Sequence, residues 1–103
     1  MEWLTAIRKS IDYIETHLKE DITVQDIANQ VFLSSLHFQR GFLIVTGYSV
    51  SEYIRNRRLY LSAIELKQTS KKIIDIAYVY GYETPESFSK AFTRFHGTTR
   101  RTI

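Results

Sequence analysis

A short sequence pattern occurs twice in this 103-residue chain and constrains its fold more than any other feature. Residues 24–28, Val-Gln-Asp-Ile-Ala, return at residues 73–77 as Ile-Ile-Asp-Ile-Ala. Each copy leads into two phenylalanines four residues apart, which begin at Phe38 and Phe88. The offset between the copies grows from 49 to 50 residues, so the second copy has one extra residue in its turn. The pattern predicts a duplicated helix-turn-helix, which could contact a repeating polymer such as DNA at two places.

The composition is that of a globular chain without disulfides. It is 44% hydrophobic and 14% aromatic, enough for one compact domain or two tightly fused subdomains. Cysteine is absent, which excludes disulfides and thiolate metal sites. No apolar run approaches the roughly 18 residues that a membrane span needs, and no signal peptide is recognisable at the N-terminus. We therefore expect a cytoplasmic protein with no membrane association and no cofactor.

Charge is distributed unevenly along the chain. Residues 1–30 hold six acids and three bases, a net of −3, whereas residues 31–103 hold eleven bases and five acids, a net of +6. A basic segment of this kind is often an ordinary solvated face. It is equally typical of a surface that binds a polyanion.

Apolar periodicity predicts helices throughout, and we expect an all-α fold of about seven helices. The first runs from Trp3 for four to five turns and is broken at Glu20-Asp21. Five more follow, at about 24–31, 35–46, 49–68, 73–80 and 84–96. The first stripe expected to face inward comprises Trp3, Leu4, Ile7, Ile11, Ile14 and Leu18. The inward residues of the later helices are expected to be Phe38, Phe42, Val45, Val50, Tyr53, Ile54, Leu61, Ile64, Leu66, Ile73, Ile76, Ala77 and Tyr80.

Capping and breaking residues set the predicted helix ends. Thr23 with Asp26, and Ser49 with Glu52, have the spacing of capping boxes. Gly47 suits a left-handed helix end. These signals divide the chain into a helix-turn-helix subdomain at 1–48, a long linker helix at 49–69 and a second helix-turn-helix subdomain at 70–103.

Each predicted pair has the features of a DNA-reading unit. Ala28 and Ala77 stand where a first helix needs a small residue beneath the second. Glutamine can bond the edge of adenine and arginine the edge of guanine, each through two hydrogen bonds. The first unit leaves Ser35, Leu36, His37, Gln39 and Arg40 on its free face, and the second leaves Glu86, Ser89, Lys90 and Thr93.

The long helix suits the spacing of the double helix. About 19 residues at 1.5 Å each span roughly 28 Å, close to the ~34 Å between successive major-groove faces. Arg55, Arg57 and Arg58 on it could meet the intervening phosphates. For any single one of them, a solubilising surface role is about as plausible.

The chain resembles the C-terminal DNA-binding domain of AraC/XylS-type bacterial transcription regulators. The resemblance rests most on Ile76-Ala77-Tyr78-Val79-Tyr80-Gly81-Tyr82-Glu83, Ser87-Phe88-Ser89-Lys90-Ala91-Phe92 and Phe95-His96-Gly97-Thr98-Thr99. It implies two helix-turn-helix subdomains joined by a long helix, with both recognition helices in the major groove. The function that it implies is the regulation of bacterial promoters through sequence-specific binding of double-stranded DNA.

Site residues follow from the resemblance by position. Leu36, Gln39 and Arg40 would read bases from the first recognition helix. Pro85, Glu86, Ser89 and Lys90 would do so from the second. The backbone contacts are expected from Ser35, His37, Arg55, Arg57, Arg58, Thr84, Thr93 and Arg94. RNA polymerase is an expected partner of such proteins, and an effector or receiver domain is expected to lie outside this chain.

Several positions depart from the family pattern. Phe32 stands where glycine is usual and must either adopt a positive φ or reshape the turn. Gly41 is expected to let its helix bend, and Leu43 replaces a residue that is often cationic. Arg100 replaces the proline that precedes a last helix, so that helix is expected to be truncated or missing. Because Glu86 is a poor base reader, we expect the first unit to specify and the second to position.

Two other classes of function are alternatives to DNA binding. Catalysis is disfavoured, because His17, His37 and His96 form no zinc-protease pattern and there is no glycine-rich phosphate loop. The serious alternative is a helical protein-interaction module. Its contact face would use the tyrosines Tyr48, Tyr60, Tyr78, Tyr80 and Tyr82.

Overall fold

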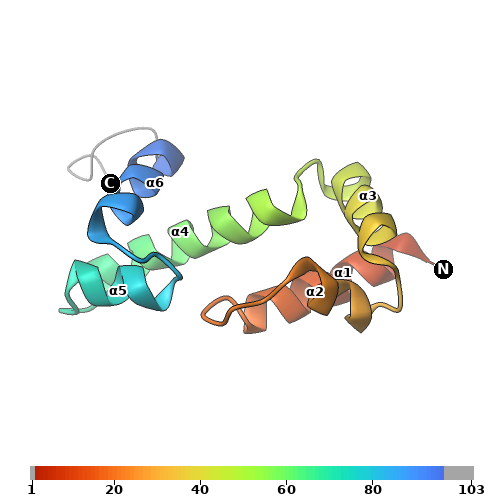
Figure 1. Ribbon diagram of the computed structural model, residues 1–103, viewed down its shortest axis with the longest axis horizontal. Coiled ribbons are helices and arrows are strands. Elements are labelled where there is room, and N and C mark those ends of the chain that lie inside the picture. The colour runs from red at the N-terminus through yellow and green to blue at the C-terminus, as the bar shows by residue number, and fades with distance from the viewer. Residues whose placement is uncertain (1, 97–103) are drawn as a thin grey trace. The chain divides into compact units, whose positions relative to one another are not determined.

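The computed structural model describes residues 2–96, and all the regular secondary structure in that range is helical (Figure 1). The helices are α1 (Trp3–Thr16), α2 (Val24–Gln30), α3 (Ser35–Thr46), α4 (Val50–Gln68), α5 (Ile73–Val79) and α6 (Pro85–His96). The all-α prediction is confirmed, with six helices in this range instead of about seven. Gly97, Arg100 and the expected truncated last helix lie outside the described residues.

The chain divides into two compact units, residues 1–55 and 56–103, and the boundary falls within α4. In the first unit α2 and α3 pack on α1, and in the second α5 and α6 pack on Leu59 and Ala63 of α4. The linker role expected of α4 stays a prediction.

The core of the first unit is built by the predicted anchors. Ile14, Ile27, Phe38 and Phe42 are fully buried. The rings of Phe38 and Phe42 lie 5.7 Å apart. At about 25 cal/mol per Å² of apolar surface removed from water, side chains of this size dominate the stability of so small a unit.

Two predictions about the first unit are wrong, one about the end of its first helix and one about which side chains face inward. α1 ends at Thr16, several residues before Glu20, although Leu18 is still buried. Leu4 and Val45, both expected to face inward, are exposed because no helix of the unit covers their sides.

Helix caps agree with the sequence signals. The Thr23 hydroxyl accepts from the Asp26 N–H at 3.1 Å, and the Asp26 carboxylate accepts from the Thr23 N–H at 3.0 Å. These bonds lower the pKa of the Asp26 carboxyl. Ser49 and Glu52 form the same reciprocal pair at 3.1 Å in both directions. Gly47 ends α3 with a φ of 82°.

The second unit has its own core, made of Leu59, Ala63, Ala77, Phe88 and Phe92. The buried side of α4 therefore differs from the expected one. Leu59 and Ala63 were missed, whereas Tyr53, Leu61, Ile64 and Leu66 are only half-buried. Ile73, expected to face inward, is exposed at the start of α5.

A buried serine stands at the centre of the longer helix in each unit. Ser10 on α1 and Ser62 on α4 have no exposed surface, and each hydroxyl donates to the carbonyl three residues earlier at 2.7 Å. A hydroxyl satisfied within its own helix needs no partner from the core.

Each unit also has a tyrosine bonded to a glutamate. The Tyr53 hydroxyl donates to Glu15 at 2.9 Å in the first unit, and the Tyr80 hydroxyl donates to Glu65 at 2.6 Å in the second. Burial and the neighbouring Glu65 carboxylate raise the pKa of the Tyr80 hydroxyl well above its usual range. The second bond ties the end of α5 to α4.

The turns after α2 and α5 have the same hydrogen bonds. In the first, the N–H groups of Phe32 and Leu33 donate to Asn29 and Ala28 at 3.3 and 3.1 Å. In the second, those of Gly81 and Tyr82 donate to Tyr78 and Ala77, both at 3.0 Å. This is the Schellman arrangement, which needs a left-handed residue after the helix.

Candidate nucleic-acid interface

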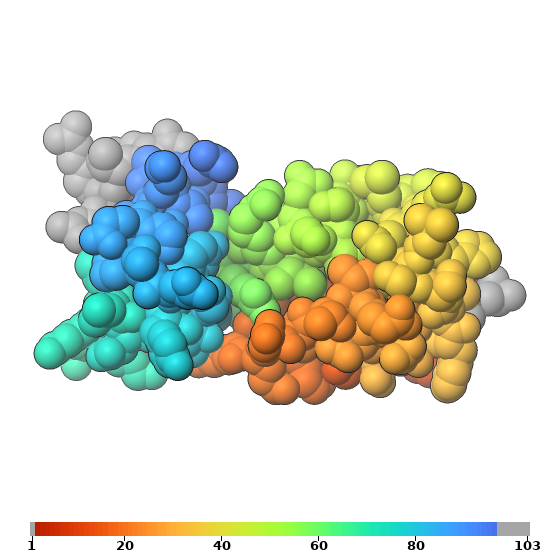
Figure 2. Space-filling view, viewed as in Figure 1, coloured from red at the N-terminus to blue at the C-terminus, as the bar shows by residue number. Residues whose placement is uncertain are grey.

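The free face of α3 carries the residues predicted to read bases. Leu36, Gln39 and Arg40 are all exposed, and their spacing of three and four residues places them along one side of the helix. Phe38 and Phe42 hold the opposite side in the core. α3, yellow in Figure 2, thus lies at the surface of the first unit.

The start of α3 is held by hydroxyl groups. Ser34 is the N-cap, and its hydroxyl accepts from the His37 N–H at 3.2 Å. Ser35 is half-buried, and its hydroxyl accepts from the side-chain amide of Gln39 at 3.3 Å. This bond orients the Gln39 amide on the exposed face. The oriented amide is suited to a two-bond contact with an adenine edge.

Trp3 from α1 braces the side of α3 next to this face. Its ring meets that of His37 edge-on, with 5.7 Å between the ring centres. It also covers Gly41 so closely that a Cβ on that residue would overlap the indole. The absence of a side chain at Gly41 makes room for Trp3. Sequence reasoning missed this contact because the two residues are 38 positions apart. The expected bend of α3 stays a prediction.

α6 presents a matching face in the second unit. Glu86, Ser89, Lys90 and Thr93 are all exposed at the same relative spacing, and Arg94 is exposed beside them. Pro85 begins the helix and is half-buried. The Thr84 hydroxyl accepts from the Ser87 N–H at 3.1 Å and so caps α6. Thr84 itself is exposed.

The three arginines of α4 have different surroundings. Arg55 is exposed. Arg57 is half-buried, and its guanidinium lies 5.3 Å from the centre of the Tyr60 ring. Arg58 is half-buried close to Gly81. Arg55 is thus the most accessible of the three to a phosphate.

The two short helices differ on their outer sides, a feature that sequence reasoning missed. On α2, the Gln25 side chain donates to Asn29 at 2.9 Å, and both residues are exposed. On α5, the corresponding residues are Ile74 and Tyr78, and both are exposed as well. Aligning the two copies of the repeat could have found this replacement of a polar pair by an apolar one.

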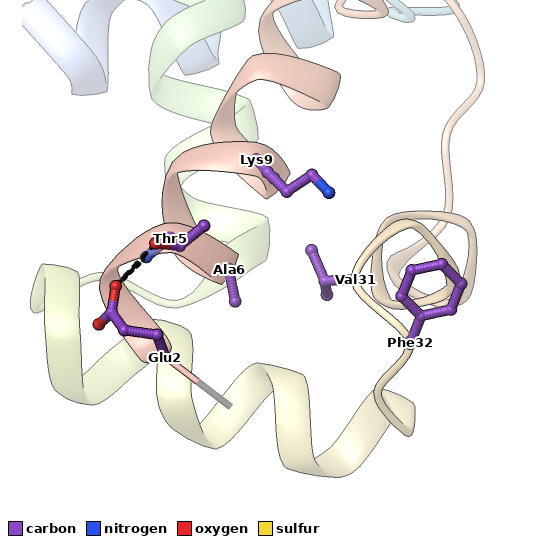
Figure 3. A pocket seen from close by; sticks show the side chains of 6 residues that line it. All are labelled: Glu2, Thr5, Ala6, Lys9, Val31 and Phe32. Atoms are coloured by element: carbon purple, nitrogen blue, oxygen red, sulfur yellow. Dashed lines mark hydrogen bonds between the residues drawn. The ribbon is translucent and has the colours of Figure 1, made fainter.

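A hollow lies between α1 and the turn after α2 (Figure 3). Ala6 and Val31 face each other across it, with Lys9 near them and the Phe32 ring beyond Val31.

The start of α1 is capped by Glu2, whose carboxylate accepts from the N–H groups of Leu4 and Thr5 and from the Thr5 hydroxyl. These bonds lower the pKa of the Glu2 carboxyl and cap α1.

Residues 2–96 contain neither a metal-binding group of side chains nor a membrane-spanning helix. Within that range, no three histidine, aspartate or glutamate side chains are grouped where they could share a metal ion. No helix there combines the length and apolar character needed to cross a membrane. Desolvation lowers the pKa of His96, the last described residue, and its ring packs against Phe92 with 4.2 Å between ring centres.

Known proteins match this chain over most of its length. A family model described as a helix-turn-helix domain matches residues 12–102. The uncharacterized HTH-type transcriptional regulator YbfP of Bacillus subtilis is 42% identical over 96 residues, which are 93% of this chain and 32% of that protein. The regulatory protein SoxS of Salmonella typhimurium is 38% identical over 88 residues, covering 85% of this chain and 82% of SoxS.

A solved structure shows the same fold. The AraC-type transcriptional regulator from Chromobacterium violaceum superposes with a TM-score of 0.89 at 26% identity, over 96% of this chain and 88% of that one. The relatives are regulators, which agrees with the prediction that this chain is not an enzyme. The chain spans about a third of the length of YbfP. This chain belongs to the AraC/XylS family of helix-turn-helix transcription regulators.

Proposed function

We propose that this regulator binds double-stranded DNA in a sequence-specific manner, with α3 and α6 as its two major-groove recognition helices. The observation that carries the proposal is the repeated turn. Each copy uses the same pair of hydrogen bonds to present a helix that is anchored by two phenylalanines and exposed on its polar side. A duplicated helix-turn-helix with free polar faces is suited to two neighbouring groove segments.

The first recognition helix supplies most of the specificity. Gln39 and Arg40 are assigned to adenine and guanine edges, with Leu36 beside them. Glu86, Ser89 and Lys90 of α6 contact bases less selectively, since the Glu86 carboxylate can accept only from the amino group of cytosine or adenine and is otherwise repelled by phosphate.

The remaining polar residues position the protein on the phosphates. This role is assigned to Ser35, His37, Arg55, Arg57, Arg58, Thr84, Thr93 and Arg94. Contacts of this kind release condensed counterions from the duplex. The affinity should therefore fall steeply as salt concentration rises.

Selection from random duplexes, followed by a salt titration of the selected site, tests the proposal. The full chain should enrich one sequence, and a plot of log affinity against log salt should have a slope of about −3.6 or steeper if at least four phosphates are contacted. A shallow slope with no enriched sequence would instead favour the helical protein-interaction module.

We further infer that the outer side of α5 contacts a protein partner, with RNA polymerase as the candidate. Ile74 and Tyr78 are exposed apolar side chains where the other copy has a hydrogen-bonded polar pair. Exposed apolar surface of this kind is typical of protein contacts. An effector or receiver domain in a longer form of the protein would supply the signal.

The two copies provide the variant that tests this contact. Ile74→Gln combined with Tyr78→Asn gives α5 the outer residues of α2. The double variant should bind DNA as the parent does but lose transcriptional stimulation of purified RNA polymerase. Full stimulation by the variant would rule the contact out.

A further inference from the structure

The reading face of α3 is flanked at both ends by an exposed leucine. Leu36, Gln39, Arg40 and Leu43 follow one another at steps of three, one and three residues, so they lie along one side of the helix. Leu36 is 61% exposed and Leu43 50% exposed. Two large apolar side chains are thus presented to water at either end of the pair assigned to base edges.

The leucines are a property of this helix and not of the repeat. With the offset of 50 residues, Leu36 corresponds to Glu86 on α6 and Leu43 to Thr93, and both of these are polar and exposed. A leucine cannot form a hydrogen bond with a phosphate, so these two positions offer the duplex only an apolar contact.

The major groove presents one apolar group, the C5-methyl of thymine. We propose that Leu36 and Leu43 contact thymine methyl groups on either side of the bases that Gln39 and Arg40 read. The inference rests on the proposed function of α3 as a recognition helix, and it names the base composition that this helix selects.

Helix geometry sets the spacing of the two thymines. Seven residues at 1.5 Å each separate the leucines by about 10.5 Å along the axis. Base pairs rise about 3.4 Å each, so with α3 running along the groove the two methyl groups are expected about three base pairs apart. The half-site read by α3 therefore has thymines, on either strand, bracketing the adenine and guanine contacts.

The test removes the methyl group and nothing else. In the selected site, each thymine is replaced in turn by 2′-deoxyuridine, and binding of the full chain is followed by fluorescence anisotropy. Two positions about three base pairs apart should each weaken binding by about 2- to 5-fold, the effect expected for one buried methyl. The other positions should have little effect.

Protein variants link each methyl to its leucine. Leu43→Ala should weaken binding to the thymine site by about 3- to 10-fold and abolish the deoxyuridine effect at one position only. Leu36→Ala should abolish it at the other. Leu4→Ala is the matched control, since Leu4 is 63% exposed but lies on α1, and it should leave both effects intact. Circular dichroism melts verify that each variant is folded.

Three outcomes would overturn the inference. Tight binding without any deoxyuridine effect, or deoxyuridine effects that survive Leu43→Ala at both positions, refutes the methyl contacts and leaves the DNA-binding function standing. Unchanged DNA binding by Leu43→Ala, with loss of polymerase stimulation, assigns Leu43 to a protein surface instead. Failure of the parent chain to bind any duplex refutes the proposed function itself, and the inference with it.

Discussion

Phe32 occupies in the first turn the position that Gly81 occupies in the second. Both have a positive φ, 59° for Phe32 and 91° for Gly81, and both are followed by the same six-residue hydrogen bond. Glycine adopts this conformation freely, whereas a side chain with a Cβ is strained in it. Phe32 is also 87% exposed, so packing does not offset the strain. Of the two alternatives that the sequence left open for Phe32, a positive φ or a reshaped turn, the structure has the positive φ.

Relief of that strain should stabilise the first unit. The left-handed conformation costs a side chain about 1–2 kcal/mol, and the greater freedom of unfolded glycine offsets part of the gain. Phe32→Gly should therefore raise the free energy of unfolding by about 0.5–1 kcal/mol. Urea denaturation measures the change. Gly81→Ala is the reciprocal control and should lower stability, because space is available there and only the φ is unfavourable. A less stable Phe32→Gly would show that the ring contributes a contact.

A methyl group at Gly41 should displace Trp3. The indole covers the α-carbon of Gly41, so Gly41→Ala should destabilise the chain by about 1–3 kcal/mol through overpacking. Thermal melts give the loss, and a second substitution, Trp3→Leu, should restore part of it by removing the clash. If Gly41→Ala is as stable as the parent, the close contact does not exist in solution.

Arg40 and Arg55 should differ in what they contribute to DNA binding. Arg40→Ala should weaken binding to the selected site by about 1–3 kcal/mol and relax base preference at one position. Arg55→Ala should weaken binding to all duplexes about equally and reduce the salt slope by about 1. Gel-shift titrations on specific and random duplexes separate the two effects. The assignment of the reading face is wrong if Arg40→Ala alters neither.

The bond from Tyr80 to Glu65 should make stability fall at high pH. The pKa of Tyr80 is raised by folding, so the unfolded chain loses this proton first and near pH 10. Below that pH the bond contributes its whole stabilisation to the folded chain. This contribution is lost as the pH rises through the pKa that Tyr80 has in the folded chain. Tyr80→Phe should cost about 1 kcal/mol at pH 8, with a difference from the parent that shrinks above about pH 10. Urea denaturation across pH 8–11 measures it, and Tyr60→Phe, at an exposed tyrosine, is the control. A difference that does not depend on pH would contradict the assignment.

Much of this architecture was predictable from local sequence. The capping boxes at Thr23 and Ser49, the left-handed Gly47 and the phenylalanine anchors are each encoded within about four residues of one another. Hydrogen bonds and helical periodicity act over that range, so the pattern alone identified them. The repeat then indicated that the unit was built twice.

Only the tertiary structure could show which apolar side chains of each helix are buried by a neighbouring helix. Leu4, Val45 and Ile73 continue apolar stripes but are exposed, because a stripe predicts a side and not the length over which a neighbour covers it. The role of Gly41 depends on Trp3 from a distant segment. The sequence by itself determined the all-α class, most of the helix ends and the two helix-turn-helix pairs, since these follow from short-range bonds. Tertiary packing determined which leucines of α3 remained exposed for a partner, because burial depends on contacts between residues far apart in the chain.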